Sequence, residues 1–159
     1  MKFRVGFGYD MHRFQSGRDF WLGGIKIDYD KGLVGHSDAD VLIHTICDAL
    51  LGAANLRDIG YHFPDTSDEF KGVDSKLLLR KTVDLIRING YEISNIDSTI
   101  CAEAPKLNPY IPAMQQKLSE TMGIEVGDIS IKATTSEKMG FVGREEGITS
   151  YAVVLIYKL

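Results

Sequence analysis

The stretch Gly35–Ala54, GHSDADVLIHTICDALLGAA, constrains the fold of this chain more than any other segment. Ser37 followed three residues later by Asp40 resembles a capping box, which predicts a helix that begins here. Behind this cap, apolar residues recur at helical spacing and predict one buried stripe, made of Ile43, Ile46, Cys47, Leu50 and Ala54. The rest of the fold has to cover that stripe.

The polar face of this helix carries the first candidate functional residues. His44 lies off the apolar stripe, seven residues beyond Ser37 and thus about 10 Å farther along the helix axis at ~1.5 Å per residue. Asp40 and Asp48 lie one turn to either side of it. His36 and Ser37 stand at the helix N-terminus, where free N–H groups and partial positive charge suit a phosphate. The alternative is a capped helix whose polar face only meets solvent.

Composition limits the function classes. With 159 residues and 44% hydrophobic content, residues 1–159 are expected to form a single domain with a proper core. There is no run of ~20 apolar residues and no signal peptide, so we expect no membrane association. A net charge of −4 argues against nucleic acid. Cys47 and Cys101 form no CxxC motif and are expected to be buried thiols in a reducing cytoplasm.

The first segment, Lys2–Phe14, alternates as a strand does. Asp10 and His12 are two residues apart, so both side chains leave the same face of the strand and together suit one metal ion. Gly6 and Gly8 lie on that face too and would leave room for something large. A chance Asp-x-His pair is the alternative.

The remaining segments predict an α+β fold, a single domain with a mixed sheet and helices on one face. Lys31-Gly32 is expected to be a turn, His62 a surface histidine in the loop Asn55–Ser67, and Asn108 the N-cap of the last helix. In chain order we expect a hairpin or bulged strand over Phe20–Tyr29, a helix from Asp74 to Asn89, a strand over Tyr91–Glu103 bent near Ser94-Asn95, a helix that ends near Gly123, a strand over Asp128–Thr135, a loop over Gly140–Gly147 and a strand over Thr149–Leu159.

Two groups of these residues suit metal ions. Asp10, His12 and His44 would give one carboxylate and two imidazoles with a fourth tetrahedral position open, the pattern of a catalytic zinc. The segment from Thr134 to Glu137 follows a strand and offers hydroxyls and one carboxylate, which suits Mg²⁺ shared with substrate phosphates. Two such cations would suit phosphoryl transfer.

Several motifs occur together and in order: GYDMH, GHSDADVLIHTICDALLGAA, DIGYHFPDT, APKLNPYIP, KATTSEK and GFVGREEGI. Over essentially the whole chain they resemble the 2-C-methyl-D-erythritol 2,4-cyclodiphosphate synthase family of the non-mevalonate isoprenoid pathway. The sequence departs from the family pattern at Tyr61, where Lys is usual, and at Val142, where Thr is usual. These two differences affect the expected polarity of the cavities and not the expected ligands.

The resemblance implies a reaction. In 4-diphosphocytidyl-2-C-methyl-D-erythritol 2-phosphate, the 2-phosphate attacks the β-phosphorus, a cyclic diphosphate forms and CMP leaves. Zn²⁺, one per chain, would bind Asp10, His12 and His44, and Glu137 would help to hold Mg²⁺ or Mn²⁺ with the substrate diphosphate. His36 and Thr135 would be the catalytic residues that stabilise the transition state.

The same resemblance implies the substrate-binding residues. One group would contact the methylerythritol phosphate end, another the cytidine, and the rest would complete the site. These are Asp10, Met11, His12, His36, Ser37, Asp58, Ile59, Gly60, Phe63, Pro64, Asp65, Thr66 and Ser67; Ala102, Glu103, Ala104, Pro105, Lys106, Leu107 and Asn108; and Thr134, Thr135, Ser136, Glu137, Phe141 and Arg144.

The resemblance also implies a homotrimer around a threefold axis, with active sites at subunit interfaces and a cytoplasmic or plastid-type stromal location. Arg144 and Glu146 would lie near that axis, where a prenyl diphosphate could bind; a purely structural role is the alternative. Two other functions stay open: a zinc-dependent phosphohydrolase, which would release inorganic phosphate or a linear product, and a non-enzymatic module that binds an isoprenoid diphosphate.

Overall fold

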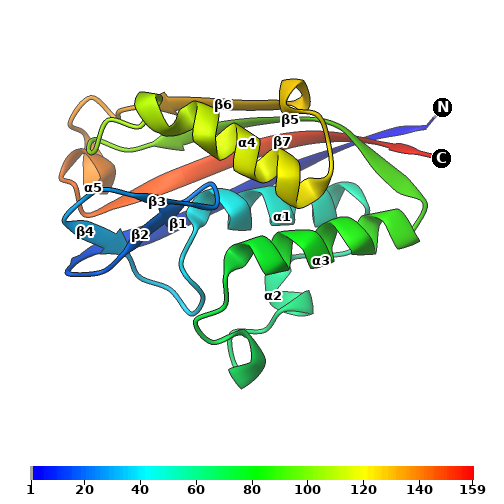
Figure 1. Ribbon diagram of the computed structural model, residues 1–159, viewed down its shortest axis with the longest axis horizontal. Helices are drawn as coiled ribbons and strands as arrows, with labels where there is room; N and C mark the ends of the chain where they lie inside the picture. The colour runs from blue at the N-terminus through cyan, green and yellow to red at the C-terminus, as the bar shows by residue number, and fades with distance from the viewer. Residues whose placement is uncertain (1) are drawn as a thin grey trace.

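Five strands of the computed structural model, which describes residues 2–159, form one mixed sheet (Figure 1). Its order is β4-β1-β7-β5-β6, with only β5 and β6 parallel and the other neighbours antiparallel. The strands are β1 (Phe3–Ser16), β4 (Lys31–Leu33), β5 (Tyr91–Cys101), β6 (Ile129–Thr134) and β7 (Gly147–Lys158). The two ends of the chain lie side by side because β1 pairs with β7 from Phe3 opposite Tyr157 onward.

The two faces of the sheet differ. On one face, inward residues of β7 such as Ala152, Val154 and Ile156 are buried beneath the helices. On the other face, large apolar side chains stay exposed although strand alternation places them in a row. They are Phe3, Val5, Phe7, Tyr9 and Met11 on β1, and Tyr151 and Val153 on β7. We call these seven residues the open sheet face.

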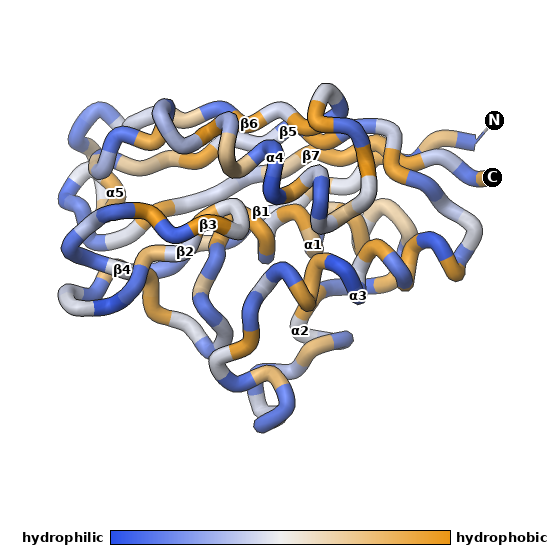
Figure 2. The backbone as a smooth tube through the Cα atoms, in the orientation of Figure 1, coloured by the Kyte–Doolittle hydropathy of each residue, from blue (hydrophilic) through white to orange (hydrophobic). Residues whose placement is uncertain are grey.

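Helix α1 (Val41–Ala53) is the centre of the core, and ten of its 13 residues are buried. The predicted single stripe is therefore too narrow, since α1 is covered by the sheet on one side and by α3 (Ser75–Ile88) on another. In Figure 2, α1 carries hydrophobic colour along most of its length.

Gly6 and Gly8 let α1 approach β1. A Cβ on Gly6 would lie 1.9 Å from the Ala49 carbonyl oxygen, and one on Gly8 would lie 2.0 Å from the Thr45 oxygen. The space that these glycines leave is thus filled by α1 itself and not by a ligand, which corrects the sequence-based expectation.

The N-cap of α1 is Asp40, not Ser37. The fully buried Asp40 carboxylate accepts hydrogen bonds from Ile43 N at 3.1 Å, Gly23 N at 2.9 Å and Gly24 N at 2.7 Å. Asp40 therefore faces the core and joins α1 to a separate two-stranded sheet, made of β2 (Phe20–Leu22) and β3 (Ile25–Ile27). The expected hairpin is confirmed, but it does not pair with β1.

Other boundaries differ in detail from the expectations. Lys31-Gly32 belongs to the edge strand β4 and is not a turn, and Gly140–Gly143 forms a short helix, α5. Asn108 is not a helix N-cap, because Asn108–Tyr110 is a 3₁₀ turn (η2) that leads into α4 (Ile111–Met122). The expected bend in β5 is confirmed as a register shift between Ile93 and Asn95, and α4 ends at the left-handed Gly123 as expected.

The remaining elements are short: α2 (Ile59–His62) and the 3₁₀ turns η1 (Asp68–Phe70) and η3 (Val126–Asp128). Cys47 and Cys101 are free thiols, and Cys101 is only half-buried, which corrects its expected burial. Within residues 2–159, no helix is both long and apolar enough to cross a membrane. The α+β single-domain prediction, with a mixed sheet and helices, is confirmed.

Candidate active site

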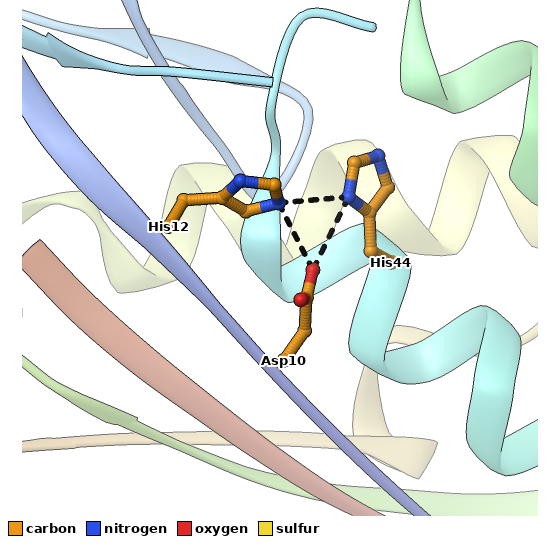
Figure 3. A group of neighbouring side chains, drawn as sticks. All are labelled: Asp10, His12 and His44. Atoms are coloured by element: carbon orange, nitrogen blue, oxygen red, sulfur yellow. Dashed lines mark hydrogen bonds and ion pairs between the residues drawn. The ribbon is translucent and has the colours of Figure 1, made fainter. Parts of the chain in front are cut away.

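Asp10, His12 and His44 converge at one point although they come from two elements (Figure 3). Asp10 and His12 leave β1 on the same side, and His44 approaches from α1. His12 Nε2 lies 3.0 Å from Asp10 Oδ2 and 3.3 Å from His44 Nδ1, and His44 Nδ1 lies 3.3 Å from Asp10 Oδ2.

This triangle fits a zinc ion. Zinc–nitrogen distances of roughly 2.0–2.1 Å in tetrahedral geometry place neighbouring ligand atoms about 3.3 Å apart. Two of the three separations in the triangle equal that value, and the third, between His12 Nε2 and Asp10 Oδ2, is 3.0 Å. The side chains are 13% to 29% exposed, so the site stays open on one side.

Hydrogen bonds on the far side of each imidazole fix which nitrogen faces the triangle. His12 Nδ1 lies 2.8 Å from the Val34 carbonyl oxygen, which can only accept, so Nδ1 carries a proton and Nε2 is the nitrogen available to a metal. His44 Nε2 lies 2.9 Å from Ser37 Oγ and 3.0 Å from Ser75 Oγ, while Nδ1 faces the triangle. Both rings thus turn a nitrogen toward the same point as the Asp10 carboxylate.

The electrostatics of the triangle favour positive charge. Burial opposes ionisation of Asp10, but hydrogen bonds and charge from His12 and His44 outweigh it, so the pKa of Asp10 lies well below its usual range. Burial lowers the pKa of His12, but the nearby Asp10 carboxylate raises it by more, so the pKa of His12 lies above its usual value. A carboxylate oxygen and two ring nitrogens this close repel one another unless a proton or a metal cation lies among them.

A cavity of about 340 Å³ opens beside the triangle. One polar wall is His36, whose Nε2 lies 3.2 Å from the Ser67 oxygen. Another is Asp48, whose carboxylate accepts from Ile59 N at 2.7 Å and so holds the start of α2 against α1. Gly60, Phe63 and Asp65 also line this cavity.

A second cavity, of about 400 Å³, lies where β5 and β6 end. Because these strands are parallel, their carboxyl ends meet at one edge of the sheet, which brings Ala102–Asn108 next to Thr134 and Thr135. Its lining is Ala102, Glu103, Pro105, Lys106, Leu107, Asn108, Pro109, Ala133, Thr134 and Thr135. The two cavities have no lining residue in common.

The turn after β6 carries Glu137, which is exposed and is not part of the metal triangle of this chain. Glu103 accepts a hydrogen bond from Lys138 N at 2.7 Å and joins this turn to the second cavity. Phe141 lies beside Met11 and His12 at the edge of a smaller hollow. The exposed Arg144 pairs with Glu146 at 2.9 Å.

Sequence reasoning misplaced some residues and missed others. Ser37 contacts His44 directly instead of lying about 10 Å away, because residues 37–40 fold back rather than continue the helix. His62 is half-buried, with Nε2 2.6 Å from the Leu56 oxygen, and is not a free surface histidine. Phe70, Val73 and Leu78 form an apolar cavity wall that was not foreseen, and Asp38 and Ser75 were not singled out. No spacing rule links them to His44.

The YgbB family model matches residues 3–157. The chain belongs to the YgbB family. It is 66% identical over 159 residues to the 2-C-methyl-D-erythritol 2,4-cyclodiphosphate synthase of Bacteroides fragilis, with 100% of each chain covered. It is 62% identical over 154 residues to the synthase of Porphyromonas gingivalis, with 97% of this chain and 95% of the other covered.

Solved structures of YgbB-family proteins share the fold. A CDP-bound 2-C-methyl-D-erythritol 2,4-cyclodiphosphate synthase matches with a TM-score of 0.89 at 34% identity, covering 97% of this chain and 100% of the other. The IspF–CDP complex of Plasmodium falciparum matches at 0.87 and 32% identity, covering 98% and 96%. The bifunctional IspDF of Campylobacter jejuni matches at 0.96 and 41% identity, where this chain spans 43% of the longer protein.

This YgbB-family chain is therefore an enzyme, a phosphorus–oxygen lyase of isoprenoid precursor biosynthesis. It converts 4-diphosphocytidyl-2-C-methyl-D-erythritol 2-phosphate to 2-C-methyl-D-erythritol 2,4-cyclodiphosphate and releases CMP. The prediction of function from sequence motifs is confirmed, and neither the phosphohydrolase nor the non-enzymatic alternative is needed.

Proposed function

We propose that the cyclisation occurs at composite sites in a homotrimer, each built from the triangle cavity of one chain and the second cavity of its neighbour. The observation that carries this proposal is that the two cavities of one chain have no lining residue in common. The substrate has a methylerythritol phosphate end and a cytidine end, and one molecule has to reach both kinds of pocket.

In this proposal the enzyme works mainly by positioning. The attacking phosphate and the β-phosphorus belong to one molecule, so folding that molecule brings them into contact without a second reactant. The cavity beside Asp58–Gly60 and the segment Phe63–Ser67 would hold the methylerythritol phosphate end, and Ala102–Asn108 would hold the cytidine. His36 and Thr135 would donate hydrogen bonds to phosphate oxygens as negative charge develops on them.

Metal ions would supply the remaining charge. Asp10, His12 and His44 would hold Zn²⁺, which as a Lewis acid polarises a phosphate oxygen. Glu137 would hold Mg²⁺ or Mn²⁺ together with substrate phosphates, which is how such hard ions commonly bind. The separation of the ligand atoms in the triangle supports the zinc ion.

The open sheet face supports the trimer. Its seven large apolar side chains lie together on one surface of the sheet. Single exposed apolar residues are common on monomeric proteins, but a contiguous apolar patch marks an interaction site. Packing three such faces around an axis would bury them and bring neighbouring chains together.

A cytoplasmic location stays a prediction.

Arg144 is our candidate for a prenyl diphosphate on the same axis. Three arginines near an axis repel one another unless an anion or acidic groups lie among them. Its pairing with Glu146 fits a structural role equally well. Calorimetry with farnesyl diphosphate separates the two roles, because binding that persists in Arg144→Ala excludes the ligand role.

Mixing two inactive variants tests the composite site. His44→Ala damages the triangle side and Glu137→Ala the nucleotide side, so random reassortment leaves about one site in four intact. We expect CMP release to return when the two are unfolded or dissociated together and reassembled. Mixing His44→Ala with His12→Ala is the matched control, because both changes lie on the same side and no intact site can form. Absence of recovery in the first mixture, with mixed trimers present, would contradict the proposal.

A further inference from the structure

Three polar side chains meet behind His44, on the side away from the metal triangle. Ser75, the first residue of α3, is fully buried, and Ser37 is 9% exposed. Asp38 lies beside them in the segment that precedes α1. A buried polar group has to be hydrogen-bonded, so the direction of each bond here can be worked out.

Asp38 can only accept. Its Oδ2 receives Ser75 N–H at 2.9 Å, and its Oδ1 receives Asp40 N–H at 3.1 Å and also contacts Ser75 Oγ. Backbone N–H groups on both carboxylate oxygens require acceptors at both positions, which an ionised carboxylate offers and an amide does not. The Ser75 hydroxyl therefore donates its only proton to Asp38.

The direction of the hydrogen bond from Ser75 to Asp38 fixes the tautomer of His44. Since its proton is used on Asp38, Ser75 Oγ meets His44 Nε2 at 3.0 Å as an acceptor, and Nε2 must carry the ring proton. Ser37 Oγ accepts Ala39 N–H at 3.2 Å and can donate its own proton to Ser75 Oγ at 3.4 Å, so it offers Nε2 a second acceptor at 2.9 Å. The lone pair of His44 then lies on Nδ1, the atom that faces Asp10 and His12.

We infer that Asp38 and Ser75 are positioning residues for the metal site, acting on His44 through the relay Asp38–Ser75–His44. The relay selects the tautomer that can bind a metal and brings negative charge toward the imidazole, which makes Nδ1 a stronger ligand. It also ties the first turn of α3 to α1 at the level of the site. This inference rests on the proposed zinc site and adds residues that do not touch the metal or the substrate.

The test is the zinc affinity of metal-free protein, measured by competition with a chromogenic chelator. We expect Ser75→Ala and Asp38→Asn each to weaken zinc binding about 10- to 100-fold, the usual effect of losing an outer hydrogen-bond partner of a metal-bound histidine. In Asp38→Asn, either orientation of the amide places its NH₂ against a backbone N–H, so the relay cannot form intact.

Thr82→Val is the matched control. Thr82 is also a fully buried hydroxyl residue of α3, and within residues 2–159 it makes no hydrogen bond to Asp38, Ser75 or His44. We expect this variant to bind zinc as the wild type does. Cobalt substitution gives a second readout, since the visible absorption of Co²⁺ reports coordination geometry and should change in Ser75→Ala and Asp38→Asn only.

The outcomes separate the two levels of the proposal. Wild-type zinc affinity and an unchanged cobalt spectrum in either folded relay variant would overturn the relay. Absence of zinc binding by wild type and Thr82→Val alike would overturn the metal site itself. If Ser75→Ala does not fold, Asp38→Asn decides the result, because its shape is that of the native side chain.

Discussion

At the scale of single residues, the position of His12 depends on a glycine that has no chemistry of its own. A Cβ on Gly35 would lie 3.1 Å from His12 Cε1, 3.3 Å from His12 Nδ1 and 3.0 Å from the Ala39 Cβ. These contacts are tight and not impossible, so a methyl group here would displace the imidazole by a few tenths of an ångström and strain its bond to Val34. Metal sites are sensitive to displacements of this kind.

We therefore expect Gly35→Ala to fold and to bind zinc about tenfold more weakly, as when an outer partner of a ligand is disturbed. Chelator competition measures this change. Gly127→Ala is the control, because a Cβ at Gly127 meets no atom within 4 Å. Equal zinc affinity in both variants would show that a methyl group at Gly35 does not displace the His12 ring, and would contradict the prediction.

At the scale of elements, the site depends on how closely α1 lies against β1, since each supplies part of the metal triangle. Gly8 is two residues before Asp10, and its Cα faces Thr45, the neighbour of His44. Any side chain on Gly8 would force the helix and the strand apart. The close approach is thus a requirement of both the core and the site.

Gly8→Ala should destabilise the fold by about 1–3 kcal/mol or more, the range for overpacked cores, and should lower zinc affinity at the same time. Gly52 lies in α1, and a Cβ there meets no atom within 4 Å. Gly52→Ala should therefore stabilise the protein by roughly 0.5–1 kcal/mol, because alanine favours a helix more than glycine does. Denaturant unfolding of the metal-free proteins measures both changes. A Gly8→Ala variant as stable as the wild type would contradict the packing argument.

At the scale of the whole molecule, the open sheet face is the surface through which the folded chain would join the proposed trimer. Phe7 is 62% exposed at the middle of this face in the single chain. In the proposed trimer it would be buried, and a carboxylate in its place would then lose its hydration without a partner. The stability of the single chain should change little, because the side chain at this position is exposed there.

Phe7→Asp should thus give folded monomers that release no CMP, because each composite site needs two chains. Ile88→Asp is the control: Ile88 is 82% exposed but lies on α3, away from the open sheet face. Analytical ultracentrifugation and the CMP assay measure the result. An active Phe7→Asp monomer would rule out sites that are shared between chains.

From the sequence alone, the α+β class, most of the long strands and helices, and the three metal-triangle residues could be predicted. Strand alternation placed Asp10 and His12 on one face, and helical spacing kept His44 off the apolar stripe. These are local periodicities, so they survive without knowledge of the tertiary structure. The ordered motifs then identified the family, because several specific segments occurred in sequence over the whole chain.

How these residues meet, and which contacts hold them in place, follows from the packing of the folded chain. Asp40 looked like part of the polar face, but it is the N-cap in the core, where it accepts hydrogen bonds from one N–H group of α1 and two of the turn between β2 and β3. Gly6 and Gly8 looked like space for a ligand, and the helix occupies that space. Ser75 gave no signal at all, because its partners His44 and Asp38 lie 31 and 37 residues away. Contacts between distant segments depend on packing, which no local period encodes.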